Sequence, residues 1–138
     1  MAIKELVHDP ILLARKSENA TLEDLQTAQD LLDTLQAHKD TCVGMAANMI
    51  GVYKRIIVFE NEGKPMLMIN PEILKMNETY ETFEGCLSLQ GEPRKTLRYD
   101  KIKVKYLTSE FQIRIKSFSG FTAQIIQHEI DHCNGVLI

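Results

Sequence analysis

The sequence predicts an α+β fold in which an antiparallel sheet packs around a C-terminal helix. Two patterns lead to this prediction. Apolar residues recur at helical spacing near the N-terminus and again near the C-terminus, whereas short apolar runs and alternation with a period of two occupy the middle of the chain. A block of strands that lies between helices is typical of proteins in which helices cover one antiparallel sheet.

The bulk composition is that of one globular domain, which we expect to span residues 1–138. Of the 138 residues, 44% are hydrophobic and 25% are charged, so the chain can bury a core. The net charge is −3 and no basic block stands out, which argues against sequence-specific binding of nucleic acid. No apolar run has the length of a membrane span, and the first residues lack the apolar core of a signal peptide. Three cysteines form no disulfide framework, so the expected compartment is a reducing cytoplasm.

The first helix is expected over about residues 22–38. Thr21 and Asp24 resemble a capping box, with an acidic residue three positions after the threonine. The apolar residues that follow at helical spacing are Leu25, Ala28, Leu32 and Leu35. Residues 41–51 come next and are small and apolar, with two glycines, which predicts a tight loop in the core.

A β-hairpin is expected in the next part of the chain. The apolar runs 56–59 and 66–69 flank residues 61–63, which are turn-forming and include a glycine. Asn70–Pro71 is expected to end the second run, because proline cannot donate a hydrogen bond to a sheet. Residues 72–83 are then predicted to be a further extended, partly exposed segment.

A second antiparallel pair and the last helix follow. Apolar and polar residues alternate over 102–106 and 111–115, so each segment is predicted to be a half-buried strand, with a turn at about 108–110. The last helix is expected over about residues 121–133, and Gly135 follows its end. Its inward face is expected to contain Phe121, Ile125 and residues 128–132.

Two histidines on the last helix, His128 and His132, are four residues apart. They therefore lie on one face of the helix, one turn from each other, where one metal ion can bind both. Glu129 follows the first histidine directly, in the position of a general base beside a metal-bound water. The competing interpretation, two surface histidines on an amphipathic helix, is weaker because the pattern is specific. The sequence thus predicts an antiparallel sheet packed around a metal-binding helix.

The third ligand must come from upstream of this helix. Only six residues follow His132, and Cys133 among them points about 100° away from the histidine around the helix. Cys86 is the best upstream candidate, although a buried structural cysteine is the ordinary interpretation of an isolated cysteine. A thiolate with two imidazoles suits a divalent transition metal, and three protein ligands leave one position open for water.

These stretches together resemble the peptide deformylase family, which carries three motifs. Glu-Gly-Cys-Leu-Ser is matched in full by residues 84–88, and Gln-His-Glu-x-Asp-His is matched in full by residues 127–132. The remaining motif, Gly-x-Gly-x-Ala-Ala-x-Gln, is matched in part by residues 42–49. Weaker likeness extends over nearly the whole chain.

The resemblance implies a bacterial, cytoplasmic hydrolase of protein biosynthesis that processes N-termini. Its substrate would be an N-formylmethionyl peptide, met as a nascent chain at the ribosome exit, and it would release formate. Cys86, His128 and His132 would bind one divalent metal ion, commonly Fe(II), with Zn(II) or Ni(II) as substitutes. The metal would lower the pKa of a bound water near neutral pH.

The resemblance also implies roles for the neighbouring residues. Glu129 would take the proton of the water and give it to the leaving amine. The backbone N–H of Leu87 would help to hold the developing oxyanion. The substrate-binding residues would be Gly44, Met45, Met49, Glu84 and Gly85.

The sequence departs from the family's pattern on the substrate side. Met49 stands where the first motif has a glutamine that donates a hydrogen bond, and a thioether cannot donate one. Loss of one oxyanion donor typically costs about 100- to 1,000-fold in rate. Cys42 replaces the first glycine of this motif, and Gln124 and residues 89–91 also differ from the usual pattern. The alternatives are therefore a weakened deformylase, a hydrolase of another small amide or peptide, and a metal-holding protein without useful catalysis.

Overall fold

The structure is a computed structural model that describes residues 3–85 and 92–137. Its elements, in chain order, are α1 (Pro10–Leu13), the 3₁₀-helix η1 (Leu22–Asp24), α2 (Leu25–Ala37), β1 (Gly44–Ala46), the 3₁₀-helix η2 (Ala47–Ile50), β2 (Ile56–Asn61), β3 (Lys64–Glu84), β4 (Arg94–Leu107), β5 (Ile113–Ser119) and α3 (Gly120–Cys133). In the described part of the chain, no helix is long and apolar enough to cross a membrane.

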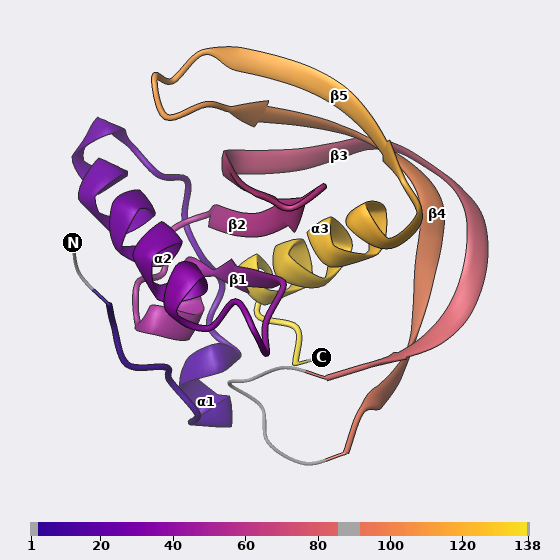
Figure 1. The fold of residues 1–138 in the computed structure, drawn as a ribbon, viewed down its shortest axis with the longest axis horizontal. Coiled ribbons are helices and arrows are strands. Elements are labelled where there is room, and N and C mark those ends of the chain that lie inside the picture. The colour runs from indigo at the N-terminus through magenta and orange to yellow at the C-terminus, as the bar shows by residue number, and fades with distance from the viewer. Residues whose placement is uncertain (1–2, 86–91, 138) are drawn as a thin grey trace.

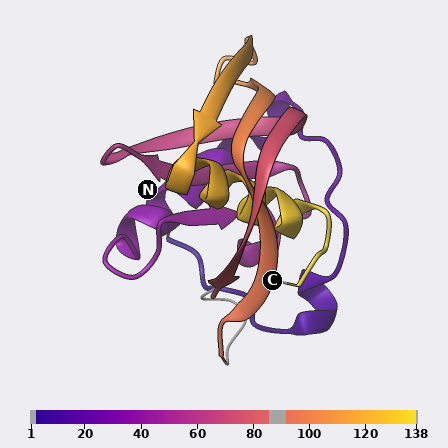
Figure 2. The ribbon, with the colours of Figure 1, turned by 90° about the vertical axis from the view of Figure 1, so that its right-hand side faces the viewer.

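The five strands form one antiparallel sheet in the order of the sequence, β1-β2-β3-β4-β5. Figure 1 shows α3 inside the curve of β3, β4 and β5, with α2 on the far side of β1 and β2. In the turned view of Figure 2, β3 and β4 pass in front of α3. The predicted α+β fold, an antiparallel sheet around the C-terminal helix, is confirmed.

The predicted hairpin is formed by β2 and β3. Its last cross-strand pair is Asn61 with Lys64, so a two-residue turn joins the strands. Glu62 and Gly63 in this turn both have positive φ, 52° and 81°. Two consecutive positive φ angles define the type I′ turn, whose twist matches that of the flanking strands.

The predicted end of the second strand at Asn70–Pro71 is wrong, because β3 continues to Glu84. The pairing with β4 instead shifts register after Ile69, as at a β-bulge, and Asn70 takes a positive φ of 52°. A bulge leaves a residue out of the ladder, so the missing N–H of Pro71 is tolerated there. The Asn70 side chain also exchanges two hydrogen bonds with the backbone of Ala20, which ties the N-terminal segment to the sheet.

Strand β2 lies between two hydrophobic clusters, which explains its unbroken apolar run. Ile57 and Phe59 pack in the cluster that contains the apolar face of α3. Ile56 and Val58 point to the opposite face of the sheet and pack in the cluster that contains the apolar face of α2. Burial on both faces fixes the position of α3 against the sheet, and α3 carries the histidine motif.

Three expectations about individual segments are corrected. The segment expected to be a loop in the core contains the short strand β1, which pairs with β2. β5 begins at Ile113 and is largely exposed, because it is the edge strand and no helix covers Ile113 or Ile115, which are 59% and 51% exposed. Phe121 is 63% exposed and does not belong to the inward face of α3.

Candidate metal centre

Helix α3 places His128 and His132 one turn apart on a buried face. Their Nε2 atoms are 3.2 Å apart. Burial, with smaller contributions from His128 and Arg98, lowers the pKa of His132 to about 3, so this imidazole is neutral. A neutral imidazole offers the lone pair that a metal ion requires.

The spacing of these two nitrogens fits a shared divalent metal ion. Two nitrogen ligands at about 2.0–2.1 Å from a tetrahedral ion lie about 3.3 Å apart. The observed 3.2 Å between the Nε2 atoms agrees with this distance. Metal-binding histidines usually donate their second ring N–H to a carboxylate or a carbonyl. Among the described residues, His128 Nδ1 has such a partner, whereas His132 Nδ1 is buried without one.

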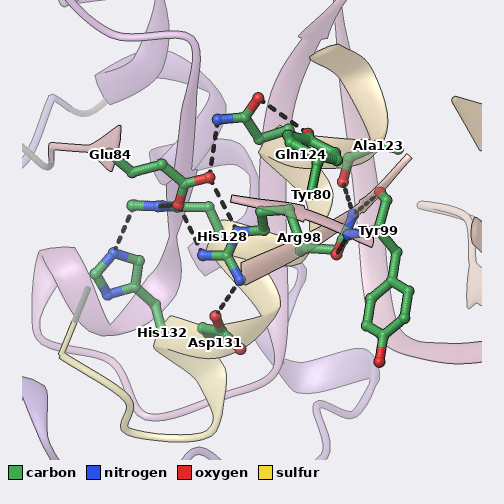
Figure 3. A network of polar contacts seen from close by, with 10 residues as sticks. Tyr80, Glu84, Arg98, Tyr99, Ala123, Gln124, His128, Asp131 and His132 are labelled. Atoms are coloured by element: carbon green, nitrogen blue, oxygen red, sulfur yellow. Dashed lines mark hydrogen bonds and ion pairs between the residues drawn. The ribbon is translucent and has the colours of Figure 1, made fainter. Parts of the chain in front are cut away.

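Glu84, at the end of β3, provides that support. His128 Nδ1 lies 2.7 Å from Glu84 Oε1 (Figure 3). Burial alone would raise the pKa of Glu84, but hydrogen bonds from His128 and Arg98 and the charge of Arg98 outweigh it and lower the pKa to about 2. The carboxylate can therefore only accept, so Nδ1 carries the proton and donates it, and Nε2 of a neutral His128 ring keeps its lone pair.

The candidate third ligand, Cys86, and the candidate oxyanion donor, Leu87, lie outside the described residues. Within residues 3–85 and 92–137, no group of three His, Cys, Asp or Glu side chains could hold a metal ion. Cys133 is buried in the hydrophobic cluster around α3, and burial raises the pKa of its thiol to about 12. Because Cys133 packs in this cluster and lies about 100° around the helix from His132, we expect the third ligand to come from outside α3.

Glu129 is buried between α3 and β1, and its Oε1 has no hydrogen-bond partner among the described residues. Burial raises the pKa of its carboxyl to about 7, opposed by the charge of His128 and assisted by that of Glu84. A carboxyl group whose pKa lies near neutrality can both accept and return a proton. The raised pKa and the free oxygen therefore suit Glu129 to proton transfer.

Gly44 in β1 is required for Glu129 to occupy this position. A Cβ atom built on Gly44 would lie 2.8 Å from Glu129 Oε2 and 2.8 Å from Ile125 Cγ2. These distances are shorter than van der Waals contact, and both neighbours belong to the buried face of α3. The glycine thus lets the strand approach the helix at the carboxylate.

We therefore expect Gly44→Ala to displace the Glu129 carboxylate and to lower kcat by about 100-fold, because misplacement of a reacting group by about 1 Å has an effect of this size. The measurement is steady-state turnover together with metal content. Ala46→Gly, a change of the same size in the same strand, is the matched control for backbone effects. Full activity of Gly44→Ala would contradict the close packing of β1 on Glu129.

A cavity of about 500 Å³ opens beside His128 and Glu129. Four of the five residues predicted to bind substrate line this cavity: Gly44, Met49, Glu84 and Gly85. The fifth, Met45, is fully buried in the cluster around α2 and does not line it.

The comparison with known proteins decides the family. The model of the family described as polypeptide deformylase matches residues 4–138. The chain belongs to the polypeptide deformylase family. It is 54% identical over 136 residues to a peptide deformylase of Clostridium beijerinckii, with 99% of each chain covered. It is 39% identical to a peptide deformylase of Brachyspira hyodysenteriae, over 90% of this chain and 70% of the relative.

Solved structures of peptide deformylases agree with this result. The structure from Thermotoga maritima superposes with a TM-score of 0.88 at 32% identity, covering 99% of this chain and 95% of the other. The actinonin-bound structure from Acinetobacter baumannii has a TM-score of 0.87 at 31% identity, with 99% and 96% covered. The family, the fold and the deformylase function predicted from the motifs are thus confirmed, together with a dependence on a divalent metal.

Met49 occupies the place of the glutamine in the first deformylase motif, and its thioether makes an internal contact. The sulfur accepts a hydrogen bond from the backbone N–H of Ala46 at 3.4 Å. Met49 is 1% exposed and lines the cavity. This side chain has no polar hydrogen, so it presents no donor to a formyl oxygen.

The deformylase motifs did not predict the polar network that surrounds Glu84. Arg98 on β4 donates to both Glu84 oxygens and also to Asp131 on α3 (Figure 3). Gln124, which lines the cavity, donates to Glu84 and accepts from the Tyr80 hydroxyl. One signal was present in the sequence. Tyr80 and Glu84 are four residues apart in a strand, so their side chains lie on the same face of the sheet. Gln124 is one helical turn before His128, so these two side chains lie on the same face of the helix.

Proposed function

We propose that residues 1–138 form one catalytic domain that deformylates N-formylmethionyl peptides at a centre made of Cys86, His128 and His132. The observation that carries this proposal is the pair of Nε2 atoms, 3.2 Å apart, next to a cavity and to the buried carboxyl group of Glu129. The metal is proposed to be Fe(II), with Zn(II) or Ni(II) as substitutes. When bound, it would lower the pKa of a water and polarise the formyl group.

The side chains around this centre are proposed to hold the ligands and to move the proton. Glu84 orients His128 through the Nδ1 contact, so that Nε2 faces the ion. The carboxylate of Glu129 takes the proton of the attacking water and then gives it to the nitrogen of the leaving amine. Cleavage of the C–N bond leaves formate and a peptide with a free amino terminus.

The substrate is proposed to lie in the cavity beside Gly44, Met49 and Gly85. The backbone N–H of Leu87 would donate to the oxyanion that develops on the formyl oxygen. With Met49 in place of the glutamine, that position provides no side-chain donor, so we propose a deformylase of reduced rate. Its substrate would be nascent chains at the ribosome exit, and its compartment the cytoplasm.

An assay of formate release from a formyl-methionyl peptide tests this function. The ferrous protein, kept free of oxygen, is expected to release formate and the deformylated peptide in equal amounts. His128→Ala is the matched loss-of-site variant and is expected to be inactive and metal-poor. Hydrolysis of other small amides without deformylation, or stoichiometric metal without any turnover, would overturn the proposed function.

The assignment of Cys86 as third ligand has its own test. Cys86→Ala is expected to lose most of its bound metal, because two imidazoles alone complete only half of a four-coordinate site. Cys133→Ala provides the control, since Cys133 is a core thiol of raised pKa. Elemental analysis after gel filtration measures both variants. Metal content equal to that of the unmodified protein in Cys86→Ala would remove Cys86 from the site.

A further inference from the structure

We propose that Gln124, held in place by Tyr80, is a positioning residue that orients the Glu84 carboxylate against His128. This inference rests on the proposed function, in which His128 is a metal ligand. Neither residue belongs to the matched motifs of the chain. Both lie in the polar network of Figure 3, and Gln124 also lines the cavity beside Glu84.

The carboxylate of Glu84 receives four hydrogen bonds from three side chains. Oε1 accepts from His128 Nδ1 and from Arg98 Nη2, each at 2.7 Å. Oε2 accepts from Arg98 Nε and from Gln124 Nε2, each at 2.9 Å. The Arg98 guanidinium donates to both oxygens and so sets the plane of the carboxylate. His128 provides the second donor to Oε1, and Gln124 provides the second donor to Oε2.

Tyr80 determines which end of the Gln124 amide faces Glu84. The Tyr80 hydroxyl donates to Gln124 Oε1 at 3.2 Å. Burial and the charge of Glu84 raise the pKa of Tyr80, so the phenol keeps the proton that it donates. With its oxygen held by Tyr80, the amide turns its NH₂ group to the carboxylate, which is the only orientation that satisfies both partners.

The secondary structure places these groups in two facing rows. Tyr80 is directly opposite Arg98 in the β3–β4 pairing, and Glu84 is four residues further along β3, so all three side chains point to the same face of the sheet. Gln124 and His128 are one turn apart on α3, which packs on that face. The contact of Gln124 with Glu84 therefore runs beside the contact of His128 with Glu84.

Removal of the Gln124 amide should loosen His128 without unfolding the protein. Arg98 would still bind both carboxylate oxygens, and its second contact, to Asp131, would remain. Oε2 would lose one of its two donors, so the carboxylate could rotate away from the geometry that holds His128 Nδ1. Loss of such an outer partner of a metal ligand typically costs about 10- to 100-fold in metal affinity.

The test uses Gln124→Leu and measures the dissociation constant for Zn²⁺ by competition with a chelator, together with the melting temperature of the metal-free protein. We expect Zn²⁺ affinity to fall about tenfold, with a melting temperature close to that of the unmodified protein. Gln36→Leu makes the same chemical change at an exposed position of α2 and should leave affinity unchanged. Unchanged affinity in Gln124→Leu, or a loss equal to that of Gln36→Leu, would overturn the proposal.

Tyr80→Phe tests whether Tyr80 acts through Gln124. The hydroxyl alone is removed, and we expect a loss of Zn²⁺ affinity of roughly two- to fivefold, the size of one hydrogen bond. In the Gln124→Leu background the same change should have no effect, because the amide that Tyr80 orients is absent. An equal loss of affinity in both backgrounds would show that Tyr80 acts independently and would overturn its assigned role.

His128→Ala separates a failure of this inference from a failure of the proposed function. If His128→Ala binds Zn²⁺ as tightly as the unmodified protein, His128 is not a ligand and the proposed centre itself fails. If His128→Ala loses Zn²⁺ while Gln124→Leu binds it with unchanged affinity, the centre stands and only the role of Gln124 is rejected.

Discussion

Glu129→Gln is expected to keep its metal and to lose turnover by about 100- to 10,000-fold, the range that a positioned general acid–base contributes. The glutamine amide has nearly the shape of the carboxyl group but cannot accept a proton from water at neutral pH. Glu129 Oε1 has no hydrogen-bond partner among the described residues, so this oxygen does not hold another of these side chains. The measurement pairs kcat for formate release with metal content per chain.

Two results would contradict the role of Glu129 in proton transfer. Loss of the metal from Glu129→Gln would make Glu129 part of the structure of the centre. Full activity would remove it as the general base. Glu129→Asp is the informative companion, because it keeps a carboxyl group but withdraws it by one methylene, and it should retain more activity than the glutamine variant.

Met49→Gln is expected to raise kcat/KM for a formyl-methionyl peptide, by up to roughly 100-fold if the missing donor is fully recovered. Methionine and glutamine have unbranched stems of similar length, so the buried position should accept the change. The new amide could accept from the Ala46 N–H, as the sulfur does now, and still donate its own N–H groups toward the cavity.

Met49→Leu is the control for this prediction, because leucine also lacks a donor and should remain near the activity of the unmodified protein. A smaller gain in Met49→Gln would indicate that Cys42 or Gln124 also misplaces the substrate. No gain, with metal content and melting temperature unchanged, would contradict the interpretation that this deformylase lacks an oxyanion donor.

The elements with strong local signals were predictable from the sequence. The spacing behind Thr21 predicted α2, and the apolar runs around Gly63 predicted the β2–β3 hairpin. Local signals did not predict that β3 continues beyond Asn70, since proline usually ends a strand and the bulge depends on pairing with β4. The exposure of Ile115 was also not predicted, because an alternating pattern does not distinguish a strand at the edge of the sheet from one that a helix covers.

The histidine pair of the site was predictable because four residues on a helix fix the geometry. The role of Glu84 as the partner of His128 was not, because 44 residues separate them and only the packing of α3 against the sheet brings them together. The same holds for the approach of Gly44 to Glu129, which depends on the position of β1 against the helix. The spacing of residues within one helix or strand predicts which of them share a face. Contacts between different elements can be identified only when the positions of those elements in the fold are known.

X-ray absorption at the zinc edge of the Zn²⁺-loaded protein tests the central claim most directly, because it counts sulfur and nitrogen ligands. A centre made of His128, His132 and Cys86 predicts two imidazole nitrogens at about 2.0–2.1 Å and one sulfur at about 2.3 Å. In Cys86→Ala the sulfur signal should disappear. A first shell of nitrogen and oxygen alone in the unmodified protein would contradict this metal centre.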